Sequence, residues 1–109
     1  MKKDNTVYLQ HIRDAIQRTK RHLTGVSWEQ FKQSELVQDA VIRQMEIIGE
    51  ATRNLSDDFR QAHSQIPWSQ IISLRNRLIH AYFAVDLTIV WEIAHTDLPL
   101  LKKQIKRML

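Results

Sequence analysis

The sequence contains no cysteine, only two glycines and two prolines, and no apolar run approaching the ~20 residues of a membrane span. The lack of cysteine excludes a disulfide framework and thiolate metal sites, and it fits a reducing compartment. So few turn-forming residues argue against a sandwich of many hairpins and favour long helices. Because the N-terminal MKKDNTVY also lacks the apolar core of a signal peptide, we expect a cytoplasmic protein without a membrane segment.

Charge of one sign is not concentrated in either half of the chain. The net charge is +4, with nine basic against seven acidic residues in 1–54 and seven against five in 55–109. A length of 109 residues, 43% of them hydrophobic and 26% charged, suits one globular domain spanning 1–109. The densest basic cluster is KKQIKR at 102–107. It is typical of a last helical turn, and a phosphate-contacting patch is the other interpretation.

Apolar residues recur at helical spacing through most of the chain. They predict principal helices over roughly four ranges, 6–23, 34–55, 67–83 and 87–107. Ser27 and Ser56 are candidate N-caps of short helical segments between these ranges, and Pro67 suits a first helical turn. Pro99 interrupts the last pattern and predicts a kink or break near Thr96–Asp97. We therefore expect an all-α fold, an antiparallel bundle of four principal helices plus short extra helices.

A stripe of polar residues runs along the most apolar predicted helix. It steps by three or four residues through Asp39, Arg43, Glu46, Glu50 and Asn54. One interpretation is a solvent-facing side with Arg43 paired to Glu46. The other is one wall of a polar cleft, formed by Arg43, Glu46 and Glu50. Gly49 lies in the same helix, where glycine costs about 1 kcal/mol relative to alanine, so it predicts close packing against a neighbouring helix or a partner chain.

The stretch RNRLIHAY, residues 75–82, carries unusually dense polar chemistry for a helix. At about 100° per residue, Asn76 and His80 would share one helical face, and Arg75 and His80 would lie roughly 140° apart. One substrate touching both would need a groove, and a second copy of the helix in a symmetric dimer could supply its other wall. Neutral His80 could take a proton from a ribose 2′-hydroxyl, Arg75 could stabilise the phosphate, and Asn76 could orient His80. The spacing alone is frequent by chance, so a structural or surface role stays open.

The motif resembles the R-x4-H-x-Y signature of HepT-type proteins in the HEPN superfamily. The likeness extends to QDAVIRQMEIIGEA (38–51), IPWSQIISLRNRLIHAYF (66–83) and the block at 85–101, and it covers nearly the whole chain. The resemblance implies a HEPN-like all-α bundle, a homodimer, and metal-independent endoribonuclease activity on RNA. It implies catalytic roles for Arg75 and His80, with Asn76 supporting them. It also implies a toxin whose MntA-type nucleotidyltransferase antitoxin attaches AMP to Tyr82.

Two other classes of function remain possible on the sequence. One is a non-catalytic helical module that binds a nucleotide or accompanies a nucleotidyltransferase. The other is a structural adaptor, for which the motif is a solvated face. The sequence has no HExxH, no histidine pair at metal-ligand spacing and no glycine-rich phosphate loop. We therefore expect neither a metal nor a cofactor.

Overall fold

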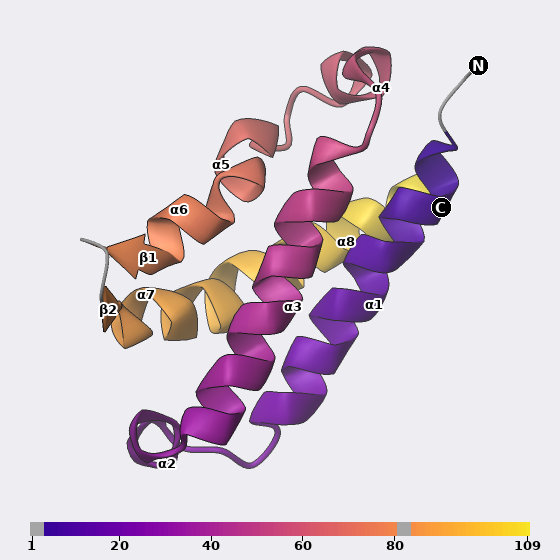
Figure 1. Ribbon diagram of the computed structural model, residues 1–109. Helices are drawn as coiled ribbons and strands as arrows, with labels where there is room; N and C mark the ends of the chain where they lie inside the picture. Colours follow the sequence, from indigo (N-terminus) through magenta and orange to yellow (C-terminus); the bar gives the residue numbers. More distant parts are fainter. Residues whose placement is uncertain (1–3, 81–83) are drawn as a thin grey trace.

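The computed structural model describes residues 4–80 and 84–109 (Figure 1). Its elements, in chain order, are α1 (Asn5–Leu23), α2 (Trp28–Gln33), α3 (Glu35–Arg53), α4 (Asp57–Ala62), α5 (Trp68–Ile72), α6 (Leu74–Leu78), β1 (Ile79–His80), β2 (Ala84–Val85), α7 (Leu87–Glu92), the π-helical segment η1 (Ile93–Asp97) and α8 (Leu98–Met108). The expected all-α class is confirmed, with one short strand pairing as its exception. Within the described ranges, none of the helices combines the length and apolar character needed to cross a membrane.

Several helices begin where a short polar side chain caps their first backbone N–H groups, and α1 ends just before a glycine. The predicted caps at Ser27 and Ser56 are confirmed, since their hydroxyls accept from the backbone N–H groups of Gln30 and Phe59. Gln30 also bonds back to the Ser27 N–H and completes a capping box. After α1, Gly25 has a φ of +73°, a conformation that costs other residues a clash with their Cβ.

The core is built mainly between α1, α3 and the run from α7 to α8. Figure 1 shows α1 and α3 side by side and antiparallel, and both contact this C-terminal run. The fully or almost fully buried apolar residues on these helices include Leu9, Ile12, Val41, Met45, Ile48, Val90, Ile93 and Ile105. Each side chain of this size contributes roughly 1.5–3 kcal/mol when removed from water, so the apolar stripes hold the bundle together.

The last helical run is irregular just before Pro99, over Ile93–Asp97. Asp86 caps α7, and its carboxylate accepts from the N–H groups of Thr88 and Ile89 at 3.0 and 3.2 Å. Pro99 has no N–H and cannot continue the i to i−4 ladder. The turn before it widens into η1, where the Leu98 N–H bonds to the Ile93 carbonyl, five residues back. The predicted irregularity near residues 96–97 is thus confirmed.

The predicted helix over 67–83 is wrong. It is divided at Ser73 into α5 and α6, and α6 ends at Leu78. The Ser73 hydroxyl donates to the Gln70 carbonyl at 3.2 Å, a local bond of the kind that competes with helix continuation. Beyond α6 the backbone is extended, and Ile79 pairs with Val85 in an antiparallel sheet of two strands, β1 and β2. Both residues are β-branched and favour extended structure.

Candidate functional site

The polar motif lies at the junction of α6 and β1. The backbone places Arg75, Asn76 and Arg77 within α6, and His80 is the second residue of β1. The side chains of Asn76 and Arg77 are exposed. Tyr82 lies outside the described residues. The motif therefore spans a change of secondary structure, from α6 to β1.

The expected placement of Asn76 and His80 on one helical face is wrong, because α6 ends two residues before His80. His80 is positioned instead by strand pairing, with its backbone opposite Ala84. The angles expected from a continuous helix consequently do not apply between Arg75 and His80. Arg75 belongs to helix α6 and His80 to the strand pair, and the helix gives way to the strand after Leu78.

Buried side chains hold α5 and α6 against the bundle. Trp68 and Ile71 on α5 and Leu74 on α6 are 7%, 8% and 3% exposed. Both helices contact α3. A Cβ placed on Gly49 of α3 would lie 3.3 Å from the carbonyl oxygen of Ile71 and 3.4 Å from that of Ile72. The predicted close approach at Gly49 is confirmed, and the neighbour is the backbone of α5.

The polar stripe of α3 borders this contact. Arg43, Glu46 and Glu50 line a hollow of about 240 Å³ together with Gly49, Arg53 and Ile72. Asn54, also in the predicted stripe, donates instead to the Glu50 carbonyl at 2.9 Å and closes the end of α3. Two arginines and two glutamates leave the hollow without formal net charge. The role of Arg43, Glu46 and Glu50 as a cleft wall stays a prediction.

A second hollow lies on the α8 side of α6. Leu74 and Arg77 line it together with Leu98, Leu100 and Leu101, and its volume is also about 240 Å³. Leu100 is 59% exposed, so this hollow has an apolar rim. The sequence analysis assigned nothing to Arg77. Its spacing of two residues from Arg75, roughly 200° in an ideal helix, is the sequence signal that favours a separate role for Arg77.

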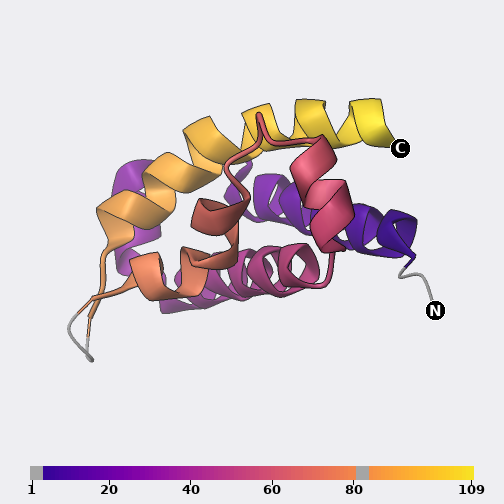
Figure 2. The same cartoon turned by 90° about the horizontal axis from the view of Figure 1, so that it is seen from above.

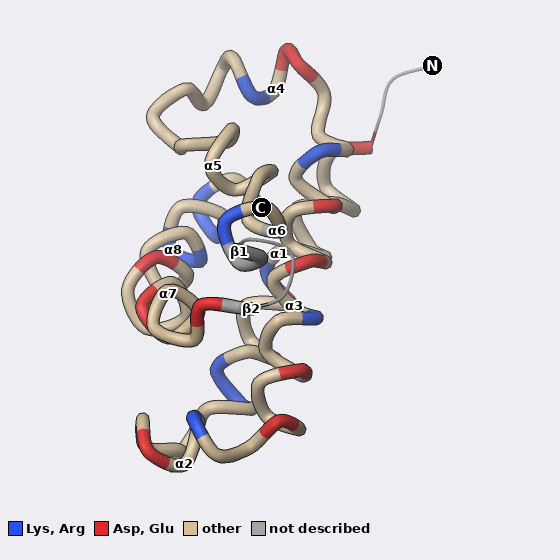
Figure 3. The backbone as a smooth tube through the Cα atoms, turned by 60° about the vertical axis from the view of Figure 1, so that its left-hand side comes forward, with Lys and Arg blue, Asp and Glu red and all other residues tan. Residues whose placement is uncertain are grey.

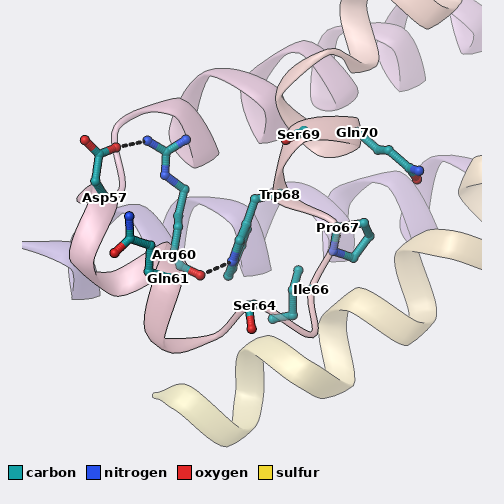
Figure 4. Close-up of a pocket in the computed structure, with 9 residues that line it drawn as sticks. All are labelled: Asp57, Arg60, Gln61, Ser64, Ile66, Pro67, Trp68, Ser69 and Gln70. Carbon is teal, nitrogen blue, oxygen red and sulfur yellow. Dashed lines mark hydrogen bonds and ion pairs between the residues drawn. The ribbon is translucent and has the colours of Figure 1, made fainter.

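A larger hollow of about 510 Å³ lies between α4 and α5, and its lining includes none of the motif residues (Figure 4). The Trp68 indole N–H donates to the carbonyl oxygens of Arg60 and His63, at 3.0 Å in both cases. Arg60 forms an ion pair with Asp57. These contacts fasten α4 to the start of α5, so we interpret this region as structural.

The histidines outside the motif show no arrangement for metal binding. Over residues 4–80 and 84–109, no three His, Asp or Glu side chains come together as a metal site. His63 packs against Phe59 in a tilted arrangement, with ring centroids 4.5 Å apart. His95 lies over Trp91, and its Nδ1 is 2.8 Å from the Trp91 carbonyl oxygen. Because a carbonyl can only accept, this contact is a hydrogen bond in the tautomer with the proton on Nδ1, and it joins the His95 ring to its own helical run.

Comparison with known proteins gives one consistent result. The family model described as ribonuclease HepT-like matches residues 12–108. Similar relatives are a gamma-glutamylcyclotransferase and predicted RNase of Methanocaldococcus jannaschii, 40% identical over all of this chain, and a predicted RNase of Caldanaerobacter subterraneus, 40% identical over 94%. A probable ribonuclease HepT of Thermococcus cleftensis is 38% identical over 99%.

The relatives differ in length. The chain spans 49% of the Methanocaldococcus protein, 91% of the Caldanaerobacter protein and 98% of the Thermococcus protein. No solved structure gives a significant match.

Proposed function

Because this chain belongs to the HepT-like ribonuclease family, we propose that it is an endoribonuclease that cuts RNA without a metal ion. The observation that carries the proposal is the family match over residues 12–108, which includes the whole motif from Arg75 to Tyr82. The junction of α6 and β1, with an exposed Asn76 beside Arg75, is a reasonable place for a polymeric substrate to bind.

The proposed reaction uses one proton acceptor, one proton donor and a fixed positive charge. Neutral His80 removes the proton of a ribose 2′-hydroxyl, and the 2′-oxygen attacks the adjacent phosphorus. The bond to the 5′-oxygen breaks, and a protonated histidine gives that oxygen its proton. The products are a 2′,3′-cyclic phosphate and a 5′-hydroxyl end. Arg75 stabilises the negative charge on the phosphorus centre, and Asn76 binds a phosphate oxygen or orients His80.

We propose that the active unit is a homodimer. Each chain supplies one histidine at the motif, whereas the reaction needs a base and an acid at the same phosphate. In a two-fold dimer the same surface of each chain meets its counterpart. Two copies of the α6–β1 junction facing one cleft would thus bring one histidine as the base and the other as the acid. The hollow of Arg43, Glu46 and Glu50 lies on α3 beside α5, and we propose that it forms part of the wall of this cleft.

We further propose that the protein is the toxin of a toxin–antitoxin pair. Its antitoxin is an MntA-type nucleotidyltransferase that attaches AMP to Tyr82. Tyr82 is two residues from His80 in the sequence. An AMP group there adds a phosphate charge that Arg75 would pair with, as anionic modifications commonly pair with arginine. The modified protein then loses both the free arginine and the space for RNA.

The test is cleavage of RNA by the purified protein in the presence of EDTA. We expect a 2′,3′-cyclic phosphate product by mass spectrometry, and a rate that changes with pH near neutrality because histidine exchanges the protons. His80→Ala should abolish the product. Activity that survives His80→Ala, or that needs an added divalent metal, would overturn the mechanism. A folded protein that binds nucleotide but cuts no RNA would support the non-catalytic binding module instead.

A further inference from the structure

A basic groove lies between α1 and α8, away from the residues of the motif. Its volume is about 510 Å³, and four of its ten lining residues are lysines, whereas none is acidic. Lys20 comes from the last turn of α1, and Lys102, Lys103 and Lys106 come from α8. No ion pair found in the described part of the chain includes any of the four. The groove therefore concentrates positive charge that the fold leaves uncompensated.

The helix dipole explains only part of this charge. Lys20 and Lys106 lie in the last turns of their helices, where cations are favourable. Lys102 and Lys103 lie in the middle of α8, which contains no acidic residue along its length. Lys102 and Lys106 are four residues apart, a spacing at which like charges repel. Burial, followed by the charges of Lys106 and Lys20, lowers the pKa of Lys102. A bound anion would offset the repulsion among these lysines.

The groove is connected to the motif by one continuous helical run. Figure 2 shows α7, η1 and α8 following one another from the strand pair to the C-terminus. Lys102 lies 16 residues beyond Asp86, which precedes α7, and this is about 24 Å at ~1.5 Å per residue. In Figure 3, α8 carries Lys and Arg segments in blue. RNA held at the α6–β1 junction would have to span about this distance, and pass from the α6 side of α8 to its α1 side, to reach the lysines.

We propose that this groove binds the phosphate backbone of single-stranded RNA that extends beyond the cleavage site. The inference rests on the proposed ribonuclease function and adds a second contact for its substrate. Lys20, Lys102 and Lys106 act as point charges on successive phosphates, and such contacts carry no sequence preference. The groove raises the affinity for long RNA and adds no affinity for a substrate too short to extend beyond the motif.

The experiment compares two triple variants that each remove three positive charges. The groove variant is Lys20→Gln, Lys102→Gln and Lys106→Gln. The matched control is Arg18→Gln, Arg21→Gln and Arg107→Gln, three exposed residues on the same two helices that do not line the groove. Both are checked for folding by circular dichroism, and both are assayed on an RNA of about 20 nucleotides and on a dinucleotide.

We expect the groove variant to raise the KM for the long RNA roughly tenfold. The slope of the logarithm of the RNA-binding constant against the logarithm of salt concentration should become shallower by about 2, since each contact to a single strand contributes ~0.7. Its activity on the dinucleotide should stay unchanged, and the control should behave as the wild type. Equal losses in the two variants, or an unchanged KM for long RNA, would overturn the proposal.

A binding measurement separates failure of the groove from failure of the ribonuclease assignment. Fluorescence anisotropy of the long RNA is measured with His80→Ala, alone and combined with the groove variant. If the wild type cuts neither substrate, the ribonuclease assignment fails. Weaker RNA binding in the combined variant still supports the groove, whereas equal binding overturns it.

Discussion

The backbone of Gly49 on α3 lies directly against the carbonyl of Ile71 on α5. A Cβ at position 49 would come within 3.3 Å of that oxygen and 3.4 Å of the Ile72 oxygen. Both neighbours are backbone atoms, which cannot rotate away as a side chain can. The separation between α3 and α5 therefore depends on the missing side chain. Because α6 follows α5 after a single residue, this contact also determines where the motif begins.

Gly49→Val is expected to destabilise the protein by about 1–3 kcal/mol, the usual range for overpacking a tight contact. The branched side chain would push α5 away from α3 and move α6, so RNA cleavage should also fall. Thermal melting and the cleavage rate, measured below the melting transition, test both effects. Gly25→Ala is the control. It strains a φ of +73° where no neighbouring atom lies within 4 Å of the new Cβ, and it should cost about 1–2 kcal/mol without changing activity.

Arg75→Ala and Arg77→Ala should differ sharply although only Asn76 separates the two residues in α6. Arg75→Ala removes the charge proposed to stabilise the transition state, and we expect kcat to fall about 10²–10³-fold. Arg77 lines the apolar hollow on the α8 side, so Arg77→Ala should keep cleavage within about threefold, as a surface change without a role in the chemistry would. Single-turnover kinetics measure both. Equal losses would show that the two arginines share one role.

Tyr82→Phe should keep the toxicity and remove its regulation by the nucleotidyltransferase. The change keeps the aromatic ring and removes only the oxygen that would accept AMP. Cells expressing the variant alone should stop growing as the wild type does, and co-expression with the nucleotidyltransferase should no longer rescue them. Intact mass should show AMP on the wild type and none on the variant. An AMP-modified and silent Tyr82→Phe protein would place the modification at another residue.

Lys102→Gln should stabilise the isolated protein slightly. Removing one charge of the i, i+4 pair with Lys106 relieves about 0.2–0.5 kcal/mol of repulsion. The lowered pKa of Lys102 gives the effect a pH dependence. The folded protein binds fewer protons than the unfolded chain between the lowered pKa and 10.5, so wild-type stability gains from this lysine as pH rises through that window. The advantage of the variant should shrink there, as thermal melts at neutral and alkaline pH would show.

The features that the sequence determined by itself are those set by local chemistry. Ser27, Ser56 and Asp86 cap helices because a short polar side chain reaches backbone N–H groups two or three residues away. Pro99 disrupts its helix because the missing N–H is a property of the residue itself. The all-α class follows from apolar spacing, and the motif residues were found by their order in the chain. None of these inferences needs a distant neighbour.

Tertiary structure decided what depends on residues far apart in the chain. Helical periodicity continues past Leu78, yet α6 ends there and Ile79 pairs with Val85, because strand hydrogen bonds need a partner that periodicity does not reveal. Gly49 predicted a close contact, and only the packing identified the carbonyl of Ile71 as its neighbour. The sequence favoured a helix end for the basic cluster at 102–107 and left a phosphate-contacting patch as the other interpretation. Lys20 joins it only because α1 packs against α8, and charges from separate helices make a groove only when the fold brings their surfaces together.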